Sequence, residues 1–244
     1  MTDQDNETLK GTALVRAILK NSHESLKWLW LIIMGESIVK AIEKYSSLLH
    51  PENVNNLFSL VNMFLTTNSL VLISFVFVFI RFYFGDSRFL DLSYEETLFR
   101  KGLESEIKKY SGRKRFFDIL LLLTHGIIFY LMALVIADPL HYIIFFIVLL
   151  MANTVWLLAQ IMVRVTNSRS YDEPLIGNLN TVFPMLVWII NNLIFQVIMS
   201  YMIFSSYSDK AIYALLASLL NSGFDFYFTW RFYFPPLNEF VENE

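Results

Sequence analysis

The sequence predicts an all-α protein: a polytopic transmembrane bundle of about six spanning helices, arranged as three hairpins, plus short amphipathic helices on the cytoplasmic side. Hydrophobic residues make up 55% of the 244-residue chain and only 17% are charged, whereas about a quarter of the residues in a soluble domain are charged. The apolar residues form long runs instead of the stripes that a soluble core requires. Each run reaches the roughly 20 residues that a helix needs to cross a bilayer.

Six apolar runs define the expected spans. They are much longer than the roughly ten alternating residues of a barrel strand, and helices satisfy their own backbone hydrogen bonds in lipid. The runs cover residues 28–48, 57–84, 116–136, 140–163, 182–204 and 211–234. The first run contains the charged residues Glu36, Lys40, Glu43 and Lys44, so it either spans or lies along the membrane surface.

The runs divide the chain into a cytoplasmic N-terminal segment (1–26), a transmembrane domain (27–235) and a cytoplasmic C-terminal tail (236–244). The transmembrane domain includes a cytoplasmic helical loop over residues 85–115. Ser93 and Glu96 have the spacing of a capping box, which predicts an amphipathic helix over 94–111 in this loop. Residues 8–20 predict a second amphipathic helix in the N-terminal segment.

The basic residues predict the topology of the chain. With both termini in the cytoplasm, sixteen of the 19 lysines and arginines fall in cytoplasmic segments, as the positive-inside rule requires. The sequence therefore predicts a multi-pass cell-membrane protein with both ends inside. This topology places Arg81, Arg164 and Arg231 at cytoplasmic helix ends, where they would act as interface anchors whose side chains snorkel to the headgroups.

Polar residues at depth are the candidates for an ion or solute pathway, because charge inside a bilayer costs several kcal/mol and needs a reason. Asp225 follows Gly223, where the last helix could unwind; alternatively Asp225 pairs with Arg231 or Lys40. Glu36 and Lys40 share a helix face and could line water or form an ion pair within their helix. Carboxamides either complete the pathway or hold helices together. The pathway candidates are Glu36, Lys40, Asn68, Asn191, Asn192, Asn221 and Asp225.

A basic cluster precedes the third run and is first of all a topology signal. It could also contact anionic lipid or a cytoplasmic activating ligand or protein partner. A nucleic-acid partner is not expected, because the sequence shows neither an aromatic stacking pattern nor a phosphate loop at the cluster. The cluster comprises Lys108, Lys109, Arg113, Lys114 and Arg115.

Several chemistries have no support in the sequence. The chain has no cysteine, which excludes thiolate nucleophiles and Cys-ligated metals. It has no Walker loop, no His-Glu-x-x-His and no Gly-x-Ser-x-Gly, so we expect no enzyme, no catalytic residue, no metal and no cofactor. His125 and His141 lie on different helices and at different depths, so a hydrogen bond from His125 to a neighbouring helix is expected instead of a haem site.

Three functions fit this pattern. The first is a homo-oligomeric ion channel or pore gated from the cytoplasm, with selectivity from Glu36, Asp225 and the asparagines. The second is a secondary transporter of a small solute or ion, favoured by Gly223 and Asp225 at mid-depth. The third is a membrane effector or sensor of a bacterial stress or phage-defence system, for which the basic loop is the main feature. The sequence favours the first of these.

Overall fold

The computed structural model describes residues 3–48, 66–99, 112–168, 176–205 and 209–234. Within these residues the chain forms six helices and no strand. The helices are α1 (Asp3–Ser46), α3 (Thr67–Phe99), α5 (Gly112–Leu134), α6 (Pro139–Ser168), α7 (Ile176–Phe204) and α8 (Lys210–Tyr233). The predicted all-α helical bundle is therefore confirmed.

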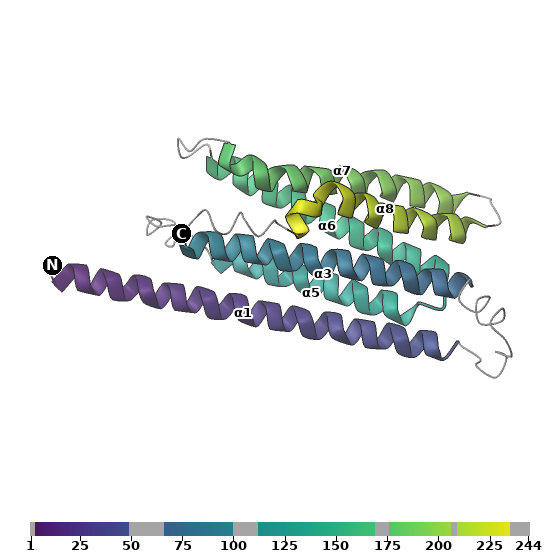
Figure 1. Ribbon diagram of the computed structural model, residues 1–244, viewed down its shortest axis with the longest axis horizontal. Helices are drawn as coiled ribbons and strands as arrows, with labels where there is room; N and C mark the ends of the chain where they lie inside the picture. The colour runs from purple at the N-terminus through teal and green to yellow at the C-terminus, as the bar shows by residue number, and fades with distance from the viewer. Residues whose placement is uncertain (1–2, 49–65, 100–111, 169–175, 206–208, 235–244) are drawn as a thin grey trace.

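Five of these helices are long and apolar enough to cross a membrane. The spans are Thr67–Leu90, Phe116–Leu134, Pro139–Met162, Phe183–Phe204 and Lys210–Trp230. Helix α1 does not qualify, because charged residues interrupt its apolar run. It nevertheless runs alongside the bundle over much of its length, packed on α3 and α5 (Figure 1).

The six helices form a closed ring in the order α1, α3, α8, α7, α6 and α5, with each helix packed mainly on its two neighbours. Helices α5 and α6 are joined by a short turn and pack as a hairpin, and α7 packs on α8 as a second antiparallel pair (Figure 1). The N-terminal end of α1 and the C-terminal end of α8 point toward the same end of the bundle. Residues from the two halves of the chain meet where α3 contacts α8.

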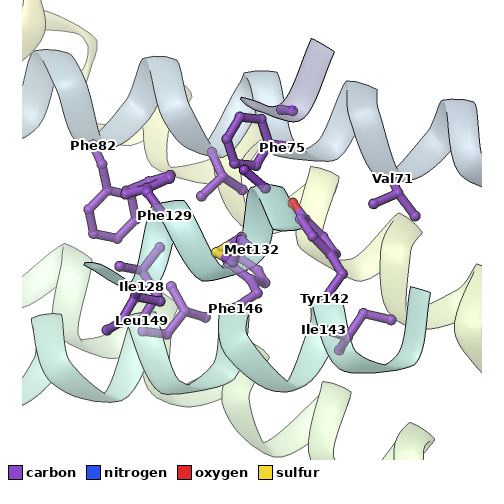
Figure 2. Close-up of a cluster of buried hydrophobic side chains, with 14 of the residues drawn as sticks. Val71, Phe75, Phe82, Ile128, Phe129, Met132, Tyr142, Ile143, Phe146 and Leu149 are labelled. Carbon is purple, nitrogen blue, oxygen red and sulfur yellow. The ribbon is translucent and has the colours of Figure 1, made fainter. Parts of the chain in front are cut away.

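Apolar side chains fill the interior of this ring. Phe75 from α3, Phe129 and Met132 from α5, and Phe146 from α6 are fully buried and point toward one another (Figure 2). Phe129 also packs edge-on against Phe75, with ring centroids 6.1 Å apart. Within the described residues, the interior of the six-helix ring is therefore filled with side chains here and does not enclose a wide channel.

The outer surface is strongly apolar. Large hydrophobic side chains on every helix are exposed, including Ile32, Phe77, Ile127, Val155 and Val197. So many exposed large apolar side chains are unusual for a soluble monomer. Combined with the five apolar spans, it identifies the chain as a multi-pass membrane protein.

Helix α1 packs closely on α5 at one glycine. A Cβ atom added at Gly126 would lie 2.3 Å from Cγ2 of Ile33 on α1. Real Cβ atoms do not come so close to another carbon, so the absence of a side chain at Gly126 permits this approach. The contact brings α1 and α5 close together at this point.

Two helices extend further than the apolar runs predicted. Helix α3 continues through Gly85 to Phe99, so Ser93 is an internal helical residue and not the N-cap of a separate helix. Helix α1 begins at Asp3, so no break separates the expected N-terminal helix from the first span. A change in hydropathy marks where a helix leaves the apolar layer and need not mark where the helix ends. The remainder of the expected cytoplasmic helix, residues 100–111, lies outside the described residues.

Candidate functional site

Arg81 on α3 lies at the centre of a buried hydrogen-bond network and is only 2% exposed. Its Nε donates to Oδ2 of Asp225 at 2.8 Å, Nη2 donates to Oδ1 of Asn192 at 2.7 Å, and Nη1 donates to Oδ1 of Asn221. These partners come from α7 and α8, so the guanidinium joins three helices. We refer to Arg81, Asn192, Asn221, Asp225 and Tyr233 as the Arg81 network.

Asp225 is fully buried and also accepts a hydrogen bond from the hydroxyl of Tyr233. Its backbone carbonyl accepts a hydrogen bond from Oγ1 of Thr229 at 2.6 Å, and Nε1 of Trp188 donates to that same Oγ1 at 3.2 Å. Thr229 has non-helical backbone angles, φ −115° and ψ 18°. The irregular point of α8 is therefore one turn after Asp225, and the expected unwinding at Gly223 is not observed.

Four buried polar atoms around the ion pair have no hydrogen-bond partner in the part of the chain that the structure describes. They are Nδ2 of Asn192, Nδ2 of Asn221, Oγ of Ser222 and Oδ1 of Asp225. Buried polar groups are paired in the great majority of cases. Such a concentration of unpaired donors and acceptors is therefore suited to hold water or a polar ligand.

A pocket of about 290 Å³, including the space open to the outside, adjoins the Arg81 network. Five aromatic residues line it, together with Gly85 and the polar residues Arg81, Asp86 and Asn153; the aromatic residues are Phe82, Phe89, Trp156, Trp188 and Tyr233. We refer to this space as the aromatic pocket. The Tyr233 ring packs on α3 at Gly85, where an added Cβ atom would lie 3.4 Å from the ring, an ordinary van der Waals distance.

Asp86 links the aromatic pocket to a buried histidine. Its Oδ2 lies 3.0 Å from Nδ1 of His125 on α5, and both residues are buried. A second pocket of about 200 Å³ shares Asp86 and is also lined by Asp118, whose Oδ1 accepts a hydrogen bond from Gln160 at 3.4 Å. The expected hydrogen bond from His125 to a neighbouring helix is confirmed.

The structure brings together four of the seven pathway candidates. Asn192, Asn221 and Asp225 contact Arg81 directly, and Nδ2 of Asn191 donates to the backbone carbonyl of Asn221 at 2.9 Å. The carboxamides do join helices, as the alternative interpretation of these residues expected. Arg81, which three of them contact, also lines the aromatic pocket.

The other three candidates lie elsewhere. Asn68 is near the start of α3, thirteen residues before Arg81 and thus roughly 20 Å away along the helix. Glu36 is exposed on α1, and Lys40 pairs with Glu43 at 2.8 Å on the bundle surface. Neither charged residue on α1 joins the Arg81 network.

The interpretation of Arg81 as an interface anchor is wrong. Its guanidinium is enclosed by three helices and paired with Asp225, because the helix continues past the end of the apolar run and places Arg81 inside the bundle. Asp225 accordingly pairs with Arg81, and Lys40 pairs with Glu43 instead. Arg164 and Arg231 lie near the ends of α6 and α8, and their side chains are outside the described residues.

The basic cluster is also beyond what the structure describes. Lys108 and Lys109 fall in the segment that is not described, and Arg113, Lys114 and Arg115 belong to the first turn of α5 without described side chains. Their expected contacts with lipid or a cytoplasmic ligand stay predictions.

Asp86 and the aromatic residues of the pocket are the site residues that the sequence did not predict. Asp86 follows the apolar run and was expected in a loop. One signal could have located it: Phe82, Asp86 and Phe89 have i, i+4 and i+7 spacing, which places them on one face of a continuing helix.

The fold and the site define a polytopic membrane protein with a buried ion pair beside an aromatic pocket. Comparison of the chain with protein-family models, with curated proteins and with solved structures gave no match.

Proposed function

We propose that this membrane protein is a secondary transporter of a small charged solute, which binds in the aromatic pocket beside the Arg81 network. The observation that carries the proposal is the enclosure of this site by α3, α6, α7 and α8 within a single chain. Ionisable residues inside a transmembrane bundle commonly mark substrate or ion pathways.

The energetics of the Arg81 network support a functional role. Well-packed apolar residues can replace a buried ion pair without loss of stability in many proteins, so stability alone gives no reason to bury Arg81 and Asp225 inside the bundle. The unpaired atoms of Asn192, Asn221 and Asp225 add further unfavourable desolvation. If a solute replaces some of the contacts within the protein, it can pair with the ion pair and with these unpaired polar atoms, which would explain why they are buried here.

The local geometry of α8 is also consistent with transport. Transporters commonly bind substrate near irregular points of transmembrane helices, and the backbone deviates from helical geometry at Thr229, one turn from Asp225. The packed interior around Phe75 and Phe129 favours stepwise passage over a permanently open channel within one chain. A rearrangement of α8 against α3 would open the pocket to either side.

Uptake measurements test this proposal. Proteoliposomes should take up at least one of three small labelled solutes, choline, acetate or glycine, with saturable kinetics and without single-channel steps in planar bilayers. Asp225→Asn should reduce uptake at least tenfold, because it removes the charge that balances Arg81. Lys210→Gln, at the start of α8 and away from the site, is the matched control. Proteoliposomes with this variant should take up the solute at the wild-type rate. Unitary current steps from the wild-type protein would contradict a transporter.

A second function, an oligomeric ion channel, is favoured by the outer face of α1. Glu36 is exposed there beside the apolar residues Ile32 and Val39. Charged side chains in a spanning helix rarely face lipid, so a ring of copies could turn these faces toward a shared aqueous pore. In that case the protein should be a ring of four or more in detergent, and Glu36→Gln should change cation selectivity. Glu24→Gln, also exposed on α1 but outside its apolar run, serves as the control.

A further inference from the structure

The aromatic pocket has a composition that matches one class of ligand. Its lining combines five aromatic rings with the carboxylate of Asp86. Two of the rings, Phe89 and Trp156, pack edge to face with centroids 4.3 Å apart. Aromatic rings attract cations through their negative faces, and the attraction is strongest for Trp in a desolvated site.

The arrangement of Trp188 suggests a preformed lining. Its Nε1 donates to Thr229 at 3.2 Å, and its ring packs edge to face on Phe232 at 4.8 Å. Tyr233 lies beside it, with ring centroids 6.0 Å apart, and donates its hydroxyl hydrogen bond to Asp225. A lining held in this way loses little conformational entropy when a ligand binds.

The charges around the pocket leave a negative excess. Arg81 is balanced by Asp225 at 2.8 Å, and its three nitrogens already donate to carboxylate and amide oxygens. Asp86 is hydrogen-bonded to His125 at 3.0 Å, and a neutral imidazole can donate this bond without cancelling the charge of the carboxylate. Asp86 is therefore available as the counter-ion of a bound cation.

We propose that the aromatic pocket binds a small organic monocation, with its ammonium group between the aromatic rings and the carboxylate of Asp86. This inference deepens the proposed function by naming the class of solute. The residues that line the pocket leave only a small space, so a small ammonium group suits this site better than a bulky solute. Five aromatic rings attract an organic cation, whereas a hydrated metal ion would gain little from them.

Three probes of the same shape and different charge test the proposal. Choline is positive, 3,3-dimethylbutan-1-ol is its neutral carbon analogue, and 3,3-dimethylbutanoate is an anion of similar bulk. Isothermal titration calorimetry on the full chain in detergent should show binding of choline, with the neutral analogue at least about tenfold weaker. The anion should not bind. If the anion bound most tightly, the proposal would be overturned, and Arg81 would be the group that attracts the ligand. Equal binding of all three probes would also overturn the proposal.

Matched variants locate the site. Asp86→Asn should weaken choline binding at least tenfold while leaving binding of the neutral analogue unchanged. Trp156→Leu should weaken choline binding as well, whereas Trp28→Leu, exposed on α1 and far from the pocket lining, should not. Thermal unfolding identifies any variant that fails to fold. If Asp86→Asn does not fold, Phe89→Leu provides the same test of the lining. Unchanged choline affinity in folded Trp156→Leu and Phe89→Leu would overturn the assignment.

Binding and transport fail in distinguishable ways. Choline that binds in calorimetry but does not enter proteoliposomes would support this site and contradict the proposed transporter. Saturable uptake of acetate or glycine without choline binding would support the transporter and contradict the monocation.

Discussion

The carboxylate of Asp225 lies 2.8 Å from Nε of Arg81, although 144 residues separate the two in the sequence. Their contact joins α3, from the first half of the chain, to α8, the last helix. Both residues are almost completely buried, and amide oxygens from α7 and α8 occupy the other guanidinium nitrogens. The pair therefore connects the two halves of the chain, and its arginine also lines the aromatic pocket.

Removing one partner of this pair should be much more harmful than removing both. Arg81→Met or Asp225→Leu leaves an uncompensated buried charge, so we expect either change to lower the free energy of unfolding by about 3–5 kcal/mol. The free energy of unfolding of the double variant should fall by less than the sum of the two single losses. Chemical or SDS unfolding in mixed micelles measures these values as a double-mutant cycle. Simple additivity would contradict direct coupling between the side chains.

The close packing of α1 on α5 predicts a position that does not tolerate a methyl group. Gly126→Ala would place a Cβ atom 2.3 Å from Ile33, so it should destabilise the protein by about 1–3 kcal/mol through overpacking. Gly35→Ala is the matched control, because no atom lies within 4 Å of its added Cβ and alanine has the better helix propensity by about 1 kcal/mol. The melting temperature should therefore fall for Gly126→Ala and stay the same or rise for Gly35→Ala. Equal melting temperatures for the two variants would contradict the α1–α5 contact.

The position of α1 beside the spanning helices predicts that it crosses the bilayer as well. Glu24 and Ser47 are both exposed near opposite ends of its bundle-packed part, roughly 35 Å apart along the helix axis. Because the chain has no cysteine, Glu24→Cys and Ser47→Cys can each be labelled without background. A membrane-impermeant maleimide should reach Glu24→Cys only from the cytoplasm and Ser47→Cys only from outside. Labelling of both from one side would place α1 along the membrane surface.

The turn between α5 and α6 predicts that a small part of the protein's stability is lost at acid pH. Oδ1 of Asp138 accepts hydrogen bonds from the backbone amides of His141 and Leu140, each at 3.1 Å, and Pro139 begins the helix. These bonds, chiefly that from the His141 amide, hold the pKa of Asp138 below its ordinary value. A lowered pKa means that the stabilisation is fully present above about pH 4, the unfolded value, and is lost as the pH falls through the folded pKa.

Asp138→Ala should therefore destabilise the protein by about 1 kcal/mol or less near pH 7, since the carboxylate is half-exposed. The difference between wild type and variant should shrink below pH 4, as followed by thermal unfolding. Asp209→Ala offers a control, because Asp209 occupies the N-cap of α8 without a side-chain capping bond and its removal should change little. A difference between wild type and Asp138→Ala that persists at pH 3 would contradict the capping role.

The sequence located part of the candidate site for a clear reason. Asn191, Asn192, Asn221 and Asp225 stand out because polar residues are rare inside apolar runs, and all four lie in the core. Arg81, the partner that Asn192, Asn221 and Asp225 share, was not recognised, because an arginine near the end of an apolar run resembles an interface anchor. Asp86 was missed for a related reason, since hydropathy falls after residue 84 while α3 continues as a helix to Phe99.

Local composition by itself determined that this protein enters a membrane, that it does so with helices, and approximately where four of the apolar spans begin and end. Those properties depend on the transfer of contiguous apolar residues into lipid. Residues that are neighbours in the sequence are therefore sufficient to predict them. Only the tertiary structure decided which polar side chains meet, because helix faces are oriented by packing between distant segments. It brought Arg81 and Asp86 to the interior beside Asp225 and Trp188, and it left Glu36 on the outer surface of α1.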